Sequence, residues 1–432
     1  MMVAAQLQSI INAHTQLEKV SDSTWQPKIA QTVTDSTDAI YLAVPETVAD
    51  LATIIEAAAQ EKWRIIPCGN GSKLDWGSLT EKINLVVSTQ KCDRIIDHAE
   101  GDLTVTVEAG VQLADLQAKL QATGQFLPID PIYPQEATIG GIVATADTGS
   151  LRHGYGGIRD LILGISFVRA DGKIAKGGGR VVKNVAGYDL MKLFTGSYGS
   201  LGIISQVTFR TYPIPATAQT FILTGDAPSI ATAIKQIKNS GLTPTAADLV
   251  TGSVSSALEL GNKLGLLVRF QTIPESIAEQ GSQLDAIAQS LDLSVTSYQE
   301  ETEAQIWQKL SELIRIPQSS DGITCKLGIL PSSAVQLFQE LAEISPTKSL
   351  ARIHIGSGLG SCQWLESDRA AITRMRSLCQ QQQGFLTVLS AAKSVKQEID
   401  IWGYSGNTAI MMQKIKQQFD PQNIFNPQRY VE

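Results

Sequence analysis

The sequence has few features of a nucleic-acid-binding, disulfide-rich or metal-binding protein. Its 35 Lys and Arg residues are outnumbered by 42 Asp and Glu residues, and it contains no basic run, so it lacks the charge pattern that nucleic-acid binding requires. Five cysteines are scattered without a CxxC pair, which argues against a disulfide framework or a metal site and indicates reduced thiols in a cytosolic protein. They are Cys68, Cys92, Cys325, Cys362 and Cys379.

Long apolar runs are also missing. The N-terminus has no basic start, and no later stretch offers about 18 consecutive apolar residues. We therefore expect no transmembrane segment and a cytoplasmic location, with membrane attachment only through partners. The 432 residues, 43% of them hydrophobic, are enough to bury a sizeable core and to form about two domains.

Glycine is abundant, but mainly in one region. Of the 35 glycines, 18 lie between Gly101 and Gly202, which indicates close backbone approach there. Apolar periodicity predicts a helix over 45–63 followed directly by a strand, and a half-buried strand over 102–109.

Two prolines within residues 212–215 mark a predicted domain boundary. Beyond it, the sequence is poorer in glycine and alternates helical stretches with apolar strands, as is typical of an α+β domain. We predict one domain over 1–215, a cap, substrate or interface domain over 216–385, and a C-terminal segment over 386–432 that returns toward the first domain.

Three glycine-rich segments carry the chemical information. The loop PCGNGSK follows an apolar strand, and its glycines allow successive N–H groups to converge on an anion. It does not fit a Rossmann fingerprint, because Leu74 occupies the sixth position. An ordinary tight turn is the alternative.

The other two segments are less specific taken singly. Residues 131–160 are rich in small side chains, which indicates either an extended ligand or a close contact between a helix and a sheet. Residues 177–210 are predominantly apolar around a few polar residues, and a structural hairpin and helix would explain them equally well.

Together, in this order, the three segments resemble the FAD-binding domain of the vanillyl-alcohol-oxidase type, the PCMH family. The matching stretches are PCGNGSK, ATIGGIVATADTGSLRHGYGGIRDLILG and KNVAGYDLMKLFTGSYGSLGIIS, and the C-terminal FDPQNIFNPQRY is similar to the family's ending. Within the family, the chain is most like the GlcE-type FAD-binding subunit of glycolate oxidase. The likeness covers residues 40–215 and the C-terminus, and it is weak between them.

The resemblance implies an α+β protein: a PCMH-type FAD-binding domain of two α/β subdomains, plus an α+β cap domain. It implies FAD between the subdomains, with the diphosphate on the PCGNGSK loop, where backbone N–H groups can satisfy its charge. The residues that the resemblance assigns to the cofactor are Cys68, Gly69, Asn70, Gly71, Ser72, Thr138, Ile139, Gly140, Gly141, Ala144, Gly149, Ser150, Gly202, Ile203 and Ile204.

Covalent flavin attachment in the family uses a His or Cys near the loop or the flavin-facing stretch. Here only Cys68, Cys92 and His153 lie near either motif, and no His stands in the loop. We therefore expect FAD to be bound without a covalent bond.

The candidate catalytic residues are His354 and Arg352, which share one face of a predicted strand. Related 2-hydroxyacid dehydrogenases have HxGDGNxH at this point, with a metal-assisted substrate site. This chain has HIGSGLGS, so we predict no metal there. A hydrogen-bonded structural histidine is the alternative role for His354.

The resemblance implies an FAD-dependent oxidoreductase that oxidises a 2-hydroxyacid, as glycolate oxidases and dehydrogenases do, with hydride transfer to flavin N5. Its implied partners are a small 2-hydroxyacid, a catalytic flavoprotein subunit and an iron–sulfur subunit. Two alternatives remain: a non-catalytic subunit for electron transfer or assembly, and a stand-alone flavin dehydrogenase for an alcohol or 2-hydroxyacid.

Overall fold

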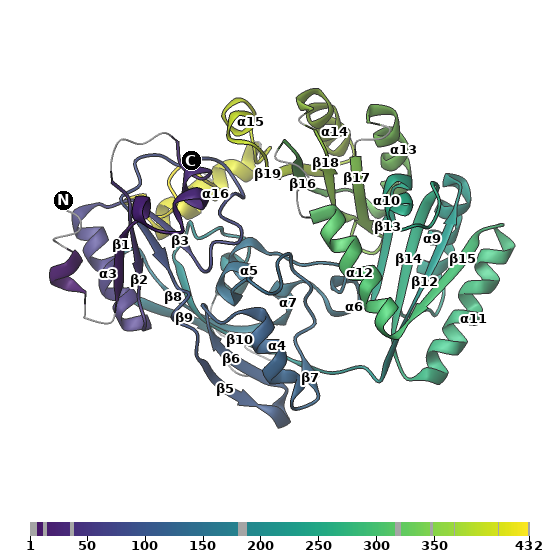
Figure 1. Ribbon diagram of the computed structural model, residues 1–432, viewed down its shortest axis with the longest axis horizontal. Helices are drawn as coiled ribbons and strands as arrows, with labels where there is room; N and C mark the ends of the chain where they lie inside the picture. Colours follow the sequence, from purple (N-terminus) through teal and green to yellow (C-terminus); the bar gives the residue numbers. More distant parts are fainter. Residues whose placement is uncertain are drawn as a thin grey trace. The chain divides into compact units, whose positions relative to one another are not determined.

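The computed structural model describes residues 7–11, 15–34, 39–179, 188–315, 321–345, 349–366, 368–404 and 406–430. The chain forms two compact units (Figure 1). Unit 1 comprises Met1–Thr148, Gly157–Ile214 and Tyr404–Glu432, and unit 2 comprises Gly149–Gly156 and Pro215–Gly403. Residues 180–187 of the third glycine-rich segment lie outside the described residues.

The first sheet of unit 1 has four strands in the order β1-β2-β4-β3, of which β2, β4 and β3 are parallel. They are β1 (Gln16–Lys19), β2 (Tyr41–Val44), β3 (Ile65–Cys68) and β4 (Leu85–Ser88). Helix α3 (Val48–Glu61) connects β2 to β3, in agreement with the predicted helix and strand. The Thr47 side chain caps it by accepting the N–H of Asp50 at 3.1 Å.

The second sheet of unit 1 is antiparallel, in the order β5-β6-β10-β8-β9. Its strands are β5 (Ile95–Ala99), β6 (Thr104–Glu108), β8 (Ile162–Val168), β9 (Ile174–Gly178) and β10 (Ile203–Arg210). The prediction that β6 is half-buried is wrong, because all five of its residues are buried. Its polar face is satisfied internally: the Thr106 and Thr208 hydroxyls lie 2.9 Å apart, and Glu108 pairs with Arg94 at 2.8 Å.

Short elements complete unit 1. A two-stranded ribbon pairs β7 (Gln125–Phe126) with β11 (Tyr212–Pro213). The yellow C-terminal helix α16 lies among the N-terminal elements of the same unit (Figure 1). The helices are η1 (Val20–Asp22), α2 (Gln26–Ala30), η2 (Glu100–Asp102), α4 (Leu113–Gln121), α5 (Ile139–Thr145), α7 (Ile158–Leu161), α8 (Leu190–Phe194) and α16 (Gly406–Phe419).

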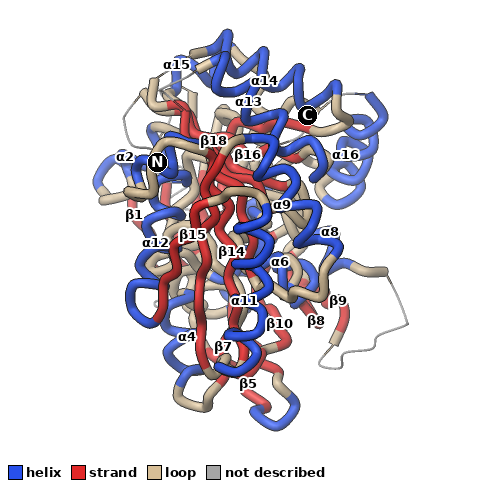
Figure 2. Tube along the Cα trace, turned by 90° about the vertical axis from the view of Figure 1, so that its right-hand side faces the viewer, coloured by secondary structure: helices blue, strands red, loops and turns tan. Residues whose placement is uncertain are grey.

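Unit 2 is built on an antiparallel eight-stranded sheet in the order β15-β12-β14-β13-β17-β18-β16-β19 (Figure 2). The strands are β12 (Thr217–Gly225), β13 (Ala246–Val250), β14 (Leu264–Thr272), β15 (Ser294–Gln299), β16 (Ile323–Gly328), β17 (Ser349–His354), β18 (Leu359–Trp364) and β19 (Phe385–Ser390). Its helices are α6 (Arg152–Tyr155), α9 (Ala227–Asn239), α10 (Gly252–Ala257), α11 (Pro274–Ser290), α12 (Glu300–Arg315), η3 (Pro331–Ser333), α13 (Ala334–Ile344), α14 (Arg369–Gln381) and α15 (Lys393–Glu398).

Helices cover both faces of this sheet. A Cβ at Gly281 of α11 would lie 2.5 Å from the Phe221 ring, so α11 packs on the face that carries Phe221. Residues of α12 share a buried cluster with Ile222, Val250 and Leu350, so α12 packs on the opposite face, because side chains alternate along a strand. This opposite face also carries the polar cluster described below.

The boundaries of the two units differ in detail from the predicted domain boundaries. Residues 386–403 belong to unit 2, because β19 pairs with β16. The short stretch Gly149–Gly156 also belongs to unit 2, where the Gly154 N–H donates to the Thr245 carbonyl at 3.0 Å. Both helices and sheets are present, so the predicted α+β class is confirmed. Within the described ranges, no helix combines the length and the apolar character needed to cross a bilayer.

Candidate functional site: a cofactor pocket and a polar cluster

Unit 1 contains a pocket of about 740 Å³, counted to include the solvent at its mouth. Twelve of the fifteen residues predicted to bind the cofactor line it: Cys68, Gly69, Asn70, Gly71, Ser72, Thr138, Gly140, Gly141, Ala144, Gly202, Ile203 and Ile204. The sequence therefore located most of this wall, although these residues come from three distant segments.

The loop after β3 presents unpaired backbone donors. Its carbonyls are held from outside: Ser88 Oγ donates to the Gly69 carbonyl at 2.8 Å, and Lys28 Nζ donates to the Asn70 carbonyl at 3.0 Å. Within the described residues, the N–H groups of residues 69–72 have no acceptor. Gly71 has a φ of +71°, which favours glycine. Such consecutive free N–H groups suit the oxygens of a diphosphate.

Helix α5 forms the facing wall, and two of its glycines have different roles. A Cβ at Gly140 would lie 2.8 Å from Ala109 Cβ, so Gly140 permits α5 to pack on the sheet. A Cβ at Gly141 would meet only Thr138 Oγ1, at 3.2 Å. The two explanations of this segment, a ligand wall and a tight helix–sheet contact, therefore apply to adjacent residues.

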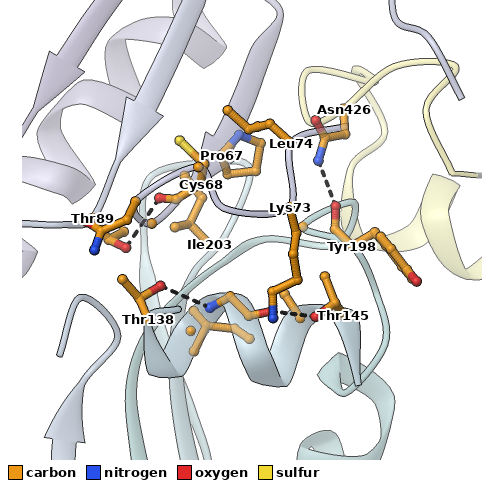
Figure 3. A pocket seen from close by; sticks show the side chains of 18 of the residues that line it. Pro67, Cys68, Lys73, Leu74, Thr89, Thr138, Thr145, Tyr198, Ile203 and Asn426 are labelled. Carbon is orange, nitrogen blue, oxygen red and sulfur yellow. Dashed lines mark hydrogen bonds between the residues drawn. The ribbon is translucent and has the colours of Figure 1, made fainter. Parts of the chain in front are cut away.

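A buried ion pair fixes a cation in the pocket. Lys73 Nζ lies 2.8 Å from Asp147 Oδ2, and both side chains are at most 5% exposed. Asp147 also accepts the Ile132 N–H at 3.0 Å. Figure 3 shows Lys73 extending from the loop toward α5. Because Asp147 neutralises Lys73, the pair fixes the ammonium group beside the free N–H groups without adding net charge to the pocket.

The remaining wall comes from residues 198–204 and from the C-terminus. Tyr198 and Asn426 line it (Figure 3), as do Gly199 and Arg429. Sequence reasoning assigned none of these four residues. The signal was present in FDPQNIFNPQRY, whose likeness to the family's ending pointed to this segment without indicating residue roles.

These residues fit FAD. Free N–H groups suit its diphosphate, and glycine and apolar side chains leave room for flat rings. Cys68 lines the pocket, but burial raises the pKa of its thiol to about 12, which keeps it protonated and poorly nucleophilic. This supports the expectation of non-covalent FAD, which stays a prediction.

Three residues predicted to bind the cofactor lie elsewhere. Ile139 is buried in the core of unit 1, and its N–H donates to the Val111 carbonyl at 2.8 Å. Gly149 and Ser150 belong to unit 2. The Ser150 hydroxyl donates to Asp248 Oδ2 at 2.6 Å and accepts from Arg352 Nη1 at 2.9 Å.

Unit 2 brings the two candidate catalytic residues into one buried cluster. Asp248 on β13 lies opposite His354 on β17, and Val250 lies opposite Arg352. His354 Nδ1 is 2.5 Å from Asp248 Oδ1, and Arg352 Nη1 is 3.6 Å from Asp248 Oδ2. Burial by itself would raise the pKa of Asp248, but His354, Arg352 and the Ser150 hydroxyl lower it to about 2. Asp248 is therefore ionised, and His354 must donate the Nδ1 proton to it.

One acceptor and one donor in this cluster remain available. Among the described residues, His354 Nε2 has no hydrogen-bond partner, and Arg352 Nε is buried without one. His354 is 4% exposed and Arg352 is 2% exposed. A carboxylate-oriented imidazole with a free second nitrogen can accept a proton, and a free guanidinium N–H can hold a carboxylate.

A second cation on the same sheet face was missed by sequence reasoning. Lys326 on β16 lies opposite Ser361 on β18, which lies opposite Arg352 on β17. The Lys326 side chain makes no hydrogen bond or ion pair within the described part of the chain. Its burial, followed by the charges of Arg152 and Arg315, lowers its pKa to about 8. A lysine on a strand carries no sequence signal for such a role.

His153, one of the residues considered for covalent attachment, lies in unit 2 beside the turn that follows β17. A Cβ at Gly356 would lie 2.8 Å from His153 Nδ1. Burial lowers the pKa of His153, which favours the neutral ring. Among the described residues, Nδ1 has no partner.

Comparison with known protein families identifies an FAD-binding domain in this chain. Residues 39–178 match the family described as "FAD binding domain". This confirms the resemblance to PCMH-type FAD-binding domains, and FAD as the cofactor.

Three curated relatives are similar to the chain. Glycolate oxidase subunit GlcD of Bacillus subtilis is 30% identical, over 60% of this chain and 57% of the relative. Glycolate oxidase subunit GlcE of Escherichia coli is 28% identical, over 87% and 95%. A probable mitochondrial D-lactate dehydrogenase of Danio rerio is 26% identical, over 90% and 83%. The chain thus spans little more than half of GlcD but nearly all of GlcE.

Solved structures support the fold. Alkyldihydroxyacetonephosphate synthase aligns with a TM-score of 0.74 at 16% identity, covering 99% of this chain and 86% of that one. A carbohydrate oxidase from Microdochium nivale aligns with a TM-score of 0.72 at 14% identity, covering 99% of each chain. At these identities the likeness concerns the fold, and it confirms the PCMH-type architecture with a cap domain.

Proposed function

We propose that this FAD-binding oxidoreductase, a relative of glycolate oxidase subunits and D-lactate dehydrogenases, oxidises a 2-hydroxyacid in a GlcE-like role. The observation that carries the proposal is the buried cluster in unit 2, where Asp248 orients His354 beside Arg352. One imidazole base and unpaired cationic donors are what a hydroxyl group next to a carboxylate requires.

Each residue then has one task. Arg352 Nε and Lys326 hold the substrate carboxylate, because both are cationic and lack a partner for these donors among the described residues. His354 Nε2 takes the hydroxyl proton, and ionised Asp248 stabilises the imidazolium that results. When bound, FAD supplies a ring that accepts the hydride from the carbon bearing the hydroxyl. Burial of the cluster keeps water from competing for these groups.

The polar cluster also indicates how the carboxylate is held. At the positions of the acidic residue, the Asn and the second His of HxGDGNxH, this chain has Ser357, Leu359 and Ser361. The Asp248 carboxylate is fully engaged by His354, Ser150 and Arg352. The proposal therefore assigns substrate orientation to protein cations, and it requires no metal ion.

A second candidate function follows from the relatives. The chain covers 95% of GlcE, which is named as a subunit, so a partner-dependent role for electron transfer or assembly is the alternative. In that role a catalytic flavoprotein and an iron–sulfur subunit would be its partners. The unit 2 cluster would then be structural, and substitutions in it would change stability rather than flavin reduction.

Anaerobic flavin reduction separates the two functions. The purified chain, reconstituted with FAD, is mixed with glycolate, D-lactate and L-lactate without oxygen, and absorbance near 450 nm is followed. We expect bleaching by at least one 2-hydroxyacid, and its loss in His354→Gln at unchanged flavin content. Bleaching that appears only after addition of partner subunits would favour the alternative.

A further inference from the structure

The C-terminal segment that follows α16 is bonded to three different walls of the FAD pocket. At β3, the Asn426 N–H donates to the Ile65 carbonyl at 2.8 Å. At the 198–204 wall, Asn426 Nδ2 donates to the Tyr198 carbonyl at 2.6 Å. At the diphosphate loop, Arg429 Nη2 donates to the Leu74 carbonyl at 2.5 Å. We name residues 420–430 the C-terminal strap.

A buried ion pair and its hydrogen bonds hold the beginning of this strap in place. Lys416 Nζ forms an ion pair with Asp420 and donates to the carbonyls of Ser200 at 3.0 Å and Phe425 at 2.8 Å. Asp420 in turn accepts the N–H groups of Ile424 and Phe425, at 3.0 and 2.8 Å. The strap therefore has a fixed path, and Asn426 and Arg429 cannot leave the pocket wall without breaking buried hydrogen bonds.

Asn426 has an acceptor that the protein leaves unused. Its side chain lines the pocket and the residue is 3% exposed. While Nδ2 is bonded to Tyr198, Oδ1 is buried without a partner among the described residues. A buried acceptor without a partner is unfavourable in the free protein, and a donor on a bound ligand would relieve it.

Arg429 contributes by holding the backbone of the loop through hydrogen bonds. Nη2 bridges the carbonyls of Leu74 and Trp76, directly after the free N–H groups of residues 69–72. Burial lowers its pKa to about 10, so it stays cationic at neutral pH. A fixed positive charge behind this loop favours a diphosphate.

We infer that the C-terminal strap is part of the FAD site: Asn426 Oδ1 accepts a hydrogen bond from an N–H or O–H group of the bound dinucleotide. Arg429 is a positioning residue: it holds the diphosphate loop in the conformation that leaves the N–H groups of residues 69–72 free. The inference rests on FAD binding and does not depend on which substrate is oxidised.

Asn423 offers a matched control for Asn426. Both are asparagines in the strap with positive φ, 52° for Asn423 and 43° for Asn426, but Asn423 is exposed. Glycine accepts such φ values, so Asn423→Gly and Asn426→Gly differ in the side chain lost rather than in backbone strain. FAD affinity is measured by titrating the apoprotein and following flavin fluorescence.

We expect Asn426→Gly to bind FAD at least tenfold more weakly, and Asn423→Gly to bind as wild type does. Titration with ADP and with FMN then identifies the part of the cofactor that loses its acceptor. Asn426→Gly with wild-type affinity for FAD, ADP and FMN would overturn the assignment. An equal loss in both variants would also overturn it, because the loss would then reflect the strap backbone.

The role of Arg429 is tested by conservative replacement. Arg429→Lys keeps the charge but loses the bridge between two carbonyls, and we expect weaker FAD binding in an apoprotein with unchanged far-UV circular dichroism. Wild-type FAD affinity in Arg429→Lys would contradict the positioning role. Urea unfolding of the apoprotein, measured in parallel, shows whether a loss of affinity exceeds what a change in fold stability explains.

Discussion

The pocket in unit 1 and the polar cluster in unit 2 use different chemical groups. The pocket relies on glycine and main-chain N–H groups of residues 69–72, with few ionised side chains among its lining residues. The cluster relies on buried charged side chains from β13 and β17 and on the half-buried Lys326 of β16. A main-chain cradle tolerates change in side chains as long as the backbone path is kept, whereas a cluster of charges depends on the identity of every member.

The largest effect is expected where the cradle is blocked. In Gly69→Val, the new side chain would overlap Thr138, and in Gly71→Val it would meet Trp25 and require a φ of +71°. Both variants should lose FAD, measured as the ratio of absorbance at 450 nm to that at 280 nm. Gly101→Val is the control, because a Cβ there meets nothing within 4 Å. Normal flavin content in both loop variants would refute the placement.

Changes in the cluster should spare FAD and affect turnover. His354→Gln and Asp248→Asn remove the proton acceptor and the group that orients it, and we expect a loss of about 10²- to 10⁴-fold in the rate of flavin reduction. Flavin content should equal that of wild type. Reduction at the wild-type rate in either variant would demote the cluster to a structural role.

Lys326 should produce a smaller, pH-dependent effect. Because its pKa is about 8, its charge is present below that pH and is lost as the pH rises through it. We expect the KM for the hydroxyacid to rise above pH 8 in the wild type. In Lys326→Met, KM should be about tenfold higher at pH 7 and free of that inflection. A wild-type KM–pH profile in the variant would contradict a carboxylate-holding role.

The smallest expected effect is a difference in apoprotein stability between substitutions at two adjacent glycines. Gly140→Ala should lower the stability of the apoprotein by about 1–3 kcal/mol, because its Cβ would press on Ala109 in the core. Gly141→Ala should change stability by less than about 1 kcal/mol, since the helix gains from alanine and Thr138 lies at 3.2 Å. Urea unfolding of the two apoproteins measures both. Equal destabilisation would show that Gly141 is also a packing residue.

The sequence predicted local structure correctly where residues close together in the chain determine it. The cap at Thr47, the helix α3 and the loop after β3 depend on residues within a few positions of one another. The burial of β6 could not be predicted, because its polar face meets Arg94, just before β5, and Thr208 of β10. A pattern of alternating polarity records which side chains are polar, but does not show whether a partner buries them.

The sequence by itself determined the chemical class: three glycine-rich segments, in this order, resemble an FAD-binding domain, and glycine in a turn after an apolar strand leaves backbone N–H groups free for an anion. The tertiary structure decided which charges meet. Asp248 and His354 are 106 residues apart and become neighbours only through the pairing of β13 with β17. The strap brings Asn426 to Tyr198, 228 residues away, for the same reason: strand order and chain path are set by burial of whole faces, and no short stretch encodes them.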